Sequence, residues 1–183
     1  MTYLRAIPGV AGSTADFDRA AVSISYRLRL GLFGGISAFA NYGKFFRHEK
    51  MDLMDYCHFN GNKTLFSNFL LIDFKLLDYY QYATNNEYLQ AHGEYNMGGL
   101  ILNKIPLLRK LNLNEIIGFH YFRAAYLNNP VVKNYYETSF GIEKFKVLRA
   151  DIVMGFDQNI KTRVGFVLGL KFNLSDGSVI EIE

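Results

Sequence analysis

The sequence has no tryptophan, one cysteine and three prolines among its 183 residues. A single thiol, that of Cys57, can form neither an intrachain disulfide nor a cysteine-based metal cluster. So few prolines argue against a disordered chain, which is usually enriched in that residue. No stretch approaches the roughly 20 consecutive apolar residues that a membrane-spanning helix requires, and this excludes a helical membrane protein.

Charge of one sign is also lacking. The chain has 20 Lys and Arg and 17 Asp and Glu, for a formal net charge of +3, and the basic residues are spread along it. We therefore expect no nucleic-acid partner. Residues 1–12 lack the charged start, apolar core and cleavage site of a secretory signal, so an exported protein would carry its signal further upstream. We expect residues 1–16 to be the start of a fragment.

Aromatic residues, by contrast, are abundant. The chain has 13 Tyr and 16 Phe, and half of its residues are hydrophobic. Aromatic residues favour β-strands, and membrane β-barrels also place them in girdles at both membrane interfaces. The composition therefore favours strands.

Apolar and polar residues alternate with a period of two over segments of about ten residues, the length of a tilted membrane strand. Such segments lie at residues 20–30, 36–46, 88–100, 113–126, 136–142, 148–157 and 163–172. In the last, one face is apolar and the other is rich in glycine. The sequence predicts an all-β fold, an antiparallel transmembrane β-barrel represented by about seven of its strands.

The links between these segments alternate in length, as they do in outer-membrane barrels, which have short periplasmic turns and longer external loops. Residues 31–35, 102–112 and 144–146 form the predicted periplasmic links, with a helical turn within 103–110. The predicted external links are residues 47–87, 127–134 and the short 158–162. Because bacterial barrels have even strand counts of about eight or more, we expect further N-terminal strands to be missing.

Several short runs resemble the C-terminal half of a family of outer-membrane barrels whose full-length members carry a carboxypeptidase-regulatory-like N-terminal domain. The resemblance implies a barrel portion at residues 17–172 and a tail at 173–183. The runs are Gly43-Lys44-Phe45, His58-Phe59-Asn60-Gly61-Asn62, Leu76-Leu77-Asp78-Tyr79-Tyr80, His92-Gly93-Glu94-Tyr95 and Leu102-Asn103-Lys104-Ile105-Pro106-Leu107-Leu108.

The layout is also similar to that of the wider BamA and TamA superfamily of bacterial surface antigens. In that superfamily a long external loop folds back into the barrel and five strands follow it. The resemblance implies that the loop tip, His58, Phe59, Asn60, Gly61 and Asn62, docks inside the lumen. The superfamily's Arg-Gly-aromatic tip pairs with lumen carboxylates, but no arginine precedes Gly61. The same ion pair is therefore not expected here.

The final strand resembles the signal by which assembly machinery recognises barrel precursors. That signal combines a polar residue, a glycine and alternating apolar positions that end on an aromatic residue. The matching residues are Arg163, Gly165, Leu168, Leu170 and Phe172.

The candidate chemistry is confined to a few charged residues that we expect to face the lumen. His92 and Glu94 lie two residues apart on one strand face, and Arg149 and Asp151 do so on another. We interpret these four as wetted lumen residues and a ladder of charges that fixes the strands. No spacing indicates a metal site, a cofactor or a hydrolase triad, so the chain is not expected to be an enzyme.

These patterns predict an integral barrel domain of the bacterial outer membrane, and the resemblance to the BamA and TamA superfamily implies a role in assembling, translocating or anchoring other proteins. Its expected partners are membrane lipid, the missing barrel strands, and barrel-assembly machinery or client proteins. A passive porin, with Arg27, Arg29, Glu137, Glu143 and Arg149 lining water, is one alternative. Another is a soluble β-barrel whose apolar face points inward to a ligand, because period two alone does not say which face meets water.

Overall fold

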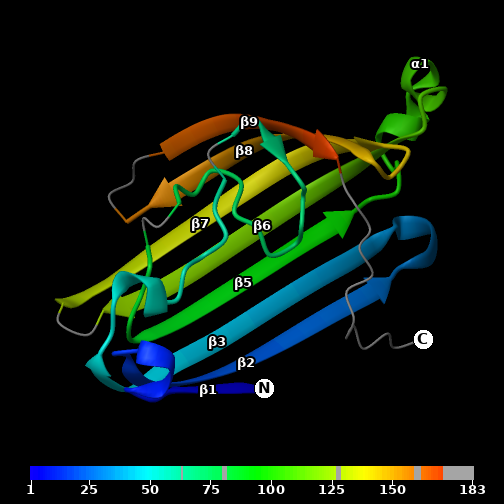
Figure 1. Ribbon diagram of the computed structural model, residues 1–183. Helices are drawn as coiled ribbons and strands as arrows, with labels where there is room; N and C mark the ends of the chain where they lie inside the picture. The colour runs from blue at the N-terminus through cyan, green and yellow to red at the C-terminus, as the bar shows by residue number, and fades with distance from the viewer. Residues whose placement is uncertain (63, 80–81, 127–128, 159–161, 171–183) are drawn as a thin grey trace.

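The computed structural model describes residues 1–62, 64–79, 82–126, 129–158 and 162–170. Within them, nine strands form one sheet in the order β1-β2-β3-β5-β6-β7-β8-β9-β4 (Figure 1). All neighbours are antiparallel except β4 and β9, which are parallel. The all-β prediction is confirmed, but the sheet is open and not closed into a barrel. The strands are β1 Thr2–Ala6, β2 Asp16–Arg29, β3 Gly35–Lys50, β4 Phe66–Ser67, β5 Glu87–Asn96, β6 Leu113–Tyr126, β7 Asn129–Lys144, β8 Leu148–Asp157 and β9 Thr162–Leu170.

Seven long strands correspond to the seven predicted segments, with differences at their ends. β5 stops at Asn96 because Gly98 and Gly99 take positive φ angles of 62° and 82°. The predicted external link at residues 127–134 is wrong, since β7 begins at Asn129 and its ladder with β6 continues past a bulge. The predicted link 47–87 is also too long, because β3 runs on to Lys50.

Two short strands were not predicted. β1 pairs with residues 17–21 of β2, and β4 lies within the long link and pairs with the last strand. Both are too short to show a period of two. The expected aromatic end of the final strand, Phe172, and the tail at residues 173–183 lie outside the described residues.

The helical segments are short and lie in the links. They are η1 Val10–Gly12, η2 Gly31–Phe33, η3 Leu53–Asp55, η4 Leu102–Lys104 and α1 Pro106–Arg109, so the helical turn predicted within 103–110 is confirmed. A buried carboxylate holds the turn before α1, because Glu115 Oε1 accepts hydrogen bonds from the main-chain amides of Ile101, at 3.1 Å, and Leu102. No helix in the described part of the chain is long and apolar enough to cross a membrane.

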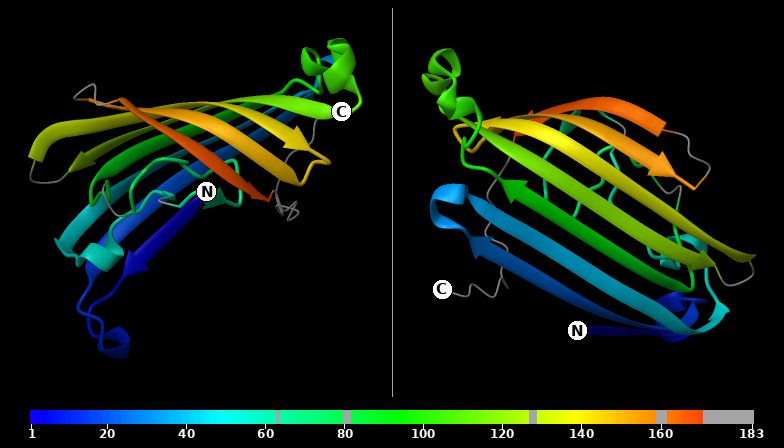
Figure 2. Two further views of the ribbon diagram at one scale, coloured as in Figure 1. Left: turned by 90° about the horizontal axis from the view of Figure 1, so that it is seen from above. Right: turned by 180° about the vertical axis from the view of Figure 1, so that it is seen from behind.

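The sheet is curved, and residues 51–86, here called the inner loop, lie against its concave face (Figure 2). The convex face is apolar and uncovered: Ile24, Phe119, Ile152 and Phe166 are 67%, 50%, 51% and 52% exposed. The concave face carries buried His92, Glu137, Arg149 and Asp151. A soluble barrel with an inward apolar face would instead have a polar convex face.

Aromatic rings from the inner loop and from the strands form the main core. Phe59, Phe74 and Tyr82 of the loop pack on Tyr88, Phe122 and Tyr135 of β5, β6 and β7. Phe59 stacks on Phe122 with a centroid distance of 4.5 Å and an interplanar angle of 13°. Stacked and edge-to-face pairs each add about 0.5–1.5 kcal/mol beyond the burial of their area. The core thus lies between the sheet and its own loop.

Space for these rings depends on glycine. An ideal Cβ on Gly43 would lie 2.4 Å from the Tyr88 ring, which is 4% exposed. We predict that Gly43→Val displaces this ring and lowers the free energy of unfolding by about 1–3 kcal/mol in a urea titration. Gly93→Val is the matched control, because a Cβ there meets nothing within 4 Å. Equal stability of the two variants would contradict this packing.

Candidate functional site on the concave face

The inner loop brings one buried cation to the concave face. The Lys75 ammonium lies 2.7 Å from Asp151 Oδ2, 3.3 Å from Glu94 Oε1 and 2.9 Å from Ser139 Oγ. The lysine is 1% exposed. Its partners come from β8, β5 and β7, so this side chain joins the loop to three strands.

A second cation completes the charge cluster, defined as Lys75, Glu94, Arg149 and Asp151. The Arg149 guanidinium donates to Asp151 through Nε and Nη2, both at 2.7 Å. It also donates to Glu94 through Nη1 at 3.1 Å and Nη2 at 2.8 Å. Burying a single unpaired ion costs roughly several kcal/mol. Each member of the cluster is therefore stable in the interior only because the others neutralise its charge. The glycine at position 141 leaves the room, since a Cβ there would lie 2.0 Å from Asp151 Oδ1.

A third carboxylate binds the main chain of the inner loop. Glu137 accepts hydrogen bonds from the amides of Lys75, at 2.7 Å, and Leu76, at 2.8 Å. The Tyr135 hydroxyl donates to the same carboxylate at 2.6 Å. Hydrogen bonds to an ionised acceptor are about twice as strong as neutral ones. Glu137 is therefore a second attachment of the loop, which uses main-chain amides and adds to the contacts of the Lys75 side chain.

The predicted loop tip lies against the rest of the inner loop and supports Lys75. The Phe74 amide donates to Asn60 O at 2.9 Å, and the Asn62 amide donates to Leu77 O at 2.9 Å. Gly61 is needed there, because a Cβ would lie 2.4 Å from Leu77 O. Phe59 joins the aromatic core, while His58 Nε2 contacts Leu53 O at 2.9 Å.

Of the four predicted residues, the structure joins Glu94, Arg149 and Asp151 in ion pairs, whereas His92 lies apart from them. Its Nδ1 lies 2.9 Å from Nδ1 of His120, and Phe74 packs over it at a centroid distance of 4.8 Å. The described residues contain no group of three or more His, Cys, Asp or Glu side chains able to hold a metal ion. Sequence reasoning missed Lys75, which is the one base in the apolar stretch Phe69-Leu70-Leu71-Ile72-Asp73-Phe74-Lys75-Leu76-Leu77.

The last strand accepts the inner loop along its edge and its inner side. The Leu168 amide donates to Leu65 O at 2.7 Å, and β4 continues beside it. A Cβ on Gly169 would lie 1.8 Å from Ser67 O, and one on Gly165 would lie 2.3 Å from the Leu76 side chain. Arg163 Nη1 donates to Asp78 Oδ2 at 3.0 Å. Most of the predicted terminal-strand signal therefore contacts the loop, while Leu170 is exposed on the convex face.

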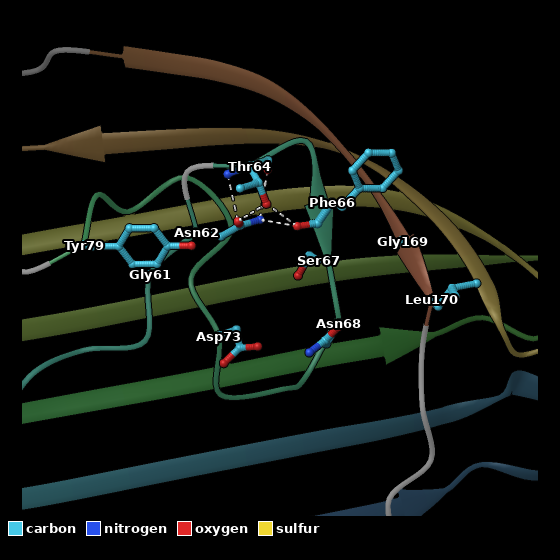
Figure 3. Close-up of a pocket in the computed structure, with 10 residues that line it drawn as sticks. All are labelled: Gly61, Asn62, Thr64, Phe66, Ser67, Asn68, Asp73, Tyr79, Gly169 and Leu170. Carbon is cyan, nitrogen blue, oxygen red and sulfur yellow. Dashed lines mark hydrogen bonds between the residues drawn. The ribbon is translucent and has the colours of Figure 1, made fainter.

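A polar pocket of about 350 Å³ lies between the inner loop and β9 (Figure 3). The Thr64 amide and hydroxyl donate to Asn62 Oδ1 at 2.9 and 2.8 Å at its upper side. Asp73 also lines the pocket, and burial raises the pKa of its carboxyl. The described lining residues offer hydrogen-bonding groups, among them the side chains of Asn62, Thr64 and Asp73.

The charge cluster predicts a strong effect of removing its loop member. Lys75→Met leaves two buried carboxylates facing one guanidinium, and we expect a loss of about 3–5 kcal/mol in unfolding free energy. Limited proteolysis of the inner loop should speed up in parallel.

Arg163→Met is the matched control, because the side chains of Arg163 and Asp78 are 46% and 32% exposed. Such a pair contributes less than about 1 kcal/mol. The double variant Lys75→Met with Asp151→Asn should recover part of the loss, since it restores the charge balance. A Lys75→Met loop as protease-resistant as the parent loop would refute the role of the cluster.

One comparison with known proteins places this geometry in a family. The family model described as the C-terminal domain of a family of unknown function, DUF5686, matches residues 1–142. Searches of curated proteins and of solved structures returned no match. The matched part contains the inner loop, Glu94 and Glu137, while Arg149 and Asp151 follow it. The chain therefore belongs to the DUF5686 family through its C-terminal domain.

Proposed function

We propose that this chain forms part of the wall of a transmembrane β-barrel in the bacterial outer membrane. The observation that carries the proposal is the inverted sheet, with apolar side chains exposed on the convex face and ion pairs buried on the concave face. Exposed apolar area costs about 25 cal/mol per Å² in water, whereas lipid removes that cost. A bilayer is the solvent in which this convex face is stable.

Strand lengths support the same proposal. A membrane strand needs about 9–11 residues when tilted. β5 and β8 have 10 residues each and β9 has 9, while β3 and β7 have 16 and extend further. Each is therefore long enough to span the hydrocarbon layer.

The position of the inner loop helps to decide between an open and a plugged barrel. It fills much of the concave side and is held by the charge cluster and by Glu137, which favours a plugged barrel over an open one. We propose a role in inserting, translocating or anchoring other proteins, with kinship to the BamA and TamA superfamily and a carboxypeptidase-regulatory-like domain in the full-length protein. Five strands, β5 to β9, follow the loop, as that resemblance implies.

A passive channel is the second candidate. It is favoured by the polar strip on the concave side of β2, where Ser23 and Arg27 are exposed. Conductance of the full-length protein in planar bilayers separates the two. A plugged barrel conducts little until residues 51–86 are removed, whereas a passive channel conducts with its loop in place.

The bilayer proposal makes a prediction about two neighbouring residues. Ile24 and Ser23 are both exposed, on the convex and the concave face respectively. We expect Ile24→Arg to destabilise the full-length protein in lipid vesicles by about 2–4 kcal/mol, the cost of arginine near the bilayer midplane. Ser23→Arg should be tolerated, because that position faces away from lipid.

The measurement is a urea titration in vesicles, read by the heat-dependent shift in gel mobility of a folded barrel. In water the two exposed positions would accept arginine equally well. Equal tolerance of the two substitutions would therefore overturn the bilayer assignment.

A further inference from the structure

The three short links at one end of the sheet carry charge of only one sign. Strand register places residues 27–35, 97–112 and 144–148 at the same end, on the right in Figure 1. Every charged residue in these ranges is basic. Arg27 and Arg29 lie on the concave side of β2, and the other five, here called the basic rim, are Lys104, Arg109, Lys110, Lys144 and Lys146.

Among the residues that the structure describes, the acids nearest to the basic rim are buried or largely covered and do not neutralise its surface. Glu115 is 1% exposed and accepts hydrogen bonds from main-chain amides, and Glu94 belongs to the charge cluster. Glu143 is likewise 1% exposed. The opposite end differs, because acids and bases pair there, as in Arg47 with Asp16 at 2.7 Å and Lys44 with Glu87 at 3.7 Å. The excess of positive charge is thus local to one end.

Large apolar side chains stand exposed among these cations. Leu32, Leu107 and Phe145 are 92%, 84% and 72% exposed, one in each of the three links. Lys144 Nζ lies 5.0 Å from the centroid of the Phe145 ring. Basic residues next to exposed apolar and aromatic ones are typical of segments that sit at the surface of an anionic bilayer.

An apolar groove begins at the same end, on the convex face of β7, β8 and β9. Its volume is about 630 Å³. Phe66 of β4 closes one side, and the strands supply apolar side chains together with one ammonium group, that of Lys144. The other lining residues are Ile142, Leu148, Arg149, Ala150, Leu168, Gly169 and Leu170, of which Arg149 turns its guanidinium to the charge cluster on the concave face. A groove of this composition fits an acyl chain whose acidic headgroup lies beside a lysine.

We propose that the basic rim binds the phosphate headgroups of anionic phospholipids in the leaflet beside the short links, and that the groove holds one acyl chain. This inference rests on the proposed membrane location and deepens it, because it fixes which end of the sheet meets that leaflet. Each Lys or Arg close to an anionic surface adds about 1 kcal/mol, or roughly fivefold in binding.

The test uses the full-length protein in nanodiscs that mix phosphatidylcholine with phosphatidylglycerol. Native mass spectrometry of the released protein gives the ratio of the two lipids that it retains. The parent should be enriched in phosphatidylglycerol. The rim variant Lys104→Gln, Lys110→Gln and Lys146→Gln should lose at least about tenfold of that enrichment, given a fivefold effect per charge.

The control variant is Arg5→Gln, Lys44→Gln and Lys50→Gln, which removes three exposed bases from the opposite end and should keep the enrichment. Ala150→Trp should remove one tightly retained lipid by filling the groove, whereas Ala38→Trp, on the convex face of β3, should not. Inorganic phosphate that displaces phosphatidylglycerol completely would show a site for free anions and overturn the lipid assignment.

Heat-dependent gel mobility of the same samples reports whether each variant has inserted as a folded barrel. It therefore separates the proposed membrane location from the proposed lipid binding by the basic rim. If every variant inserts but the rim variant retains phosphatidylglycerol like the parent, the basic rim has no lipid role and the membrane location stands. If the parent itself fails to insert, the membrane location is wrong and the inference falls with it.

Discussion

The charge cluster is the interaction on which the rest of the structure depends. Arg149 and Asp151 are buried on the concave face, the Glu94 side chain beside them is 10% exposed, and none of these ions is stable there alone. Lys75 supplies the missing charge from the inner loop, at 2.7 Å from Asp151. The sheet therefore needs the loop, and the loop is placed by the sheet. The aromatic core forms between two surfaces that the ions have already brought together.

The strands were predictable because their chemistry is local. A period of two assigns each residue to a face, and the two faces of β8 follow from the order of residues such as Asp151 and Ile152. Curvature and strand neighbours then place the faces as convex and concave. The ends were harder, since β7 continues through a stretch rich in Asn and Pro, residue types that usually mark turns, by means of a bulge.

The site was only partly predictable. Arg149 and Asp151 can be predicted to interact because they lie two residues apart on one strand face. Their partner Lys75, however, is 76 residues from Asp151 in the chain. No periodic pattern records a contact of that kind. The hydrogen bonds from the Lys75 and Leu76 amides to Glu137 are equally invisible, because every residue except proline has an amide. The single base in the stretch from Phe69 to Leu77 is the one local trace of the arrangement.

The pairing of β4 with β9 has a consequence for the order in which the fold can form. The inner loop is synthesised long before the strands that hold it, since its contacts reach from Leu65 to Leu168 and from Lys75 to Asp151. Such long-range contacts incur the entropy of loop closure before they contribute any stability, and they form slowly. The contacts of the loop with Asp151 and Leu168 can therefore form only when the C-terminal hairpin is present. The docking of the inner loop on β8 and β9 is therefore a late and cooperative step of folding.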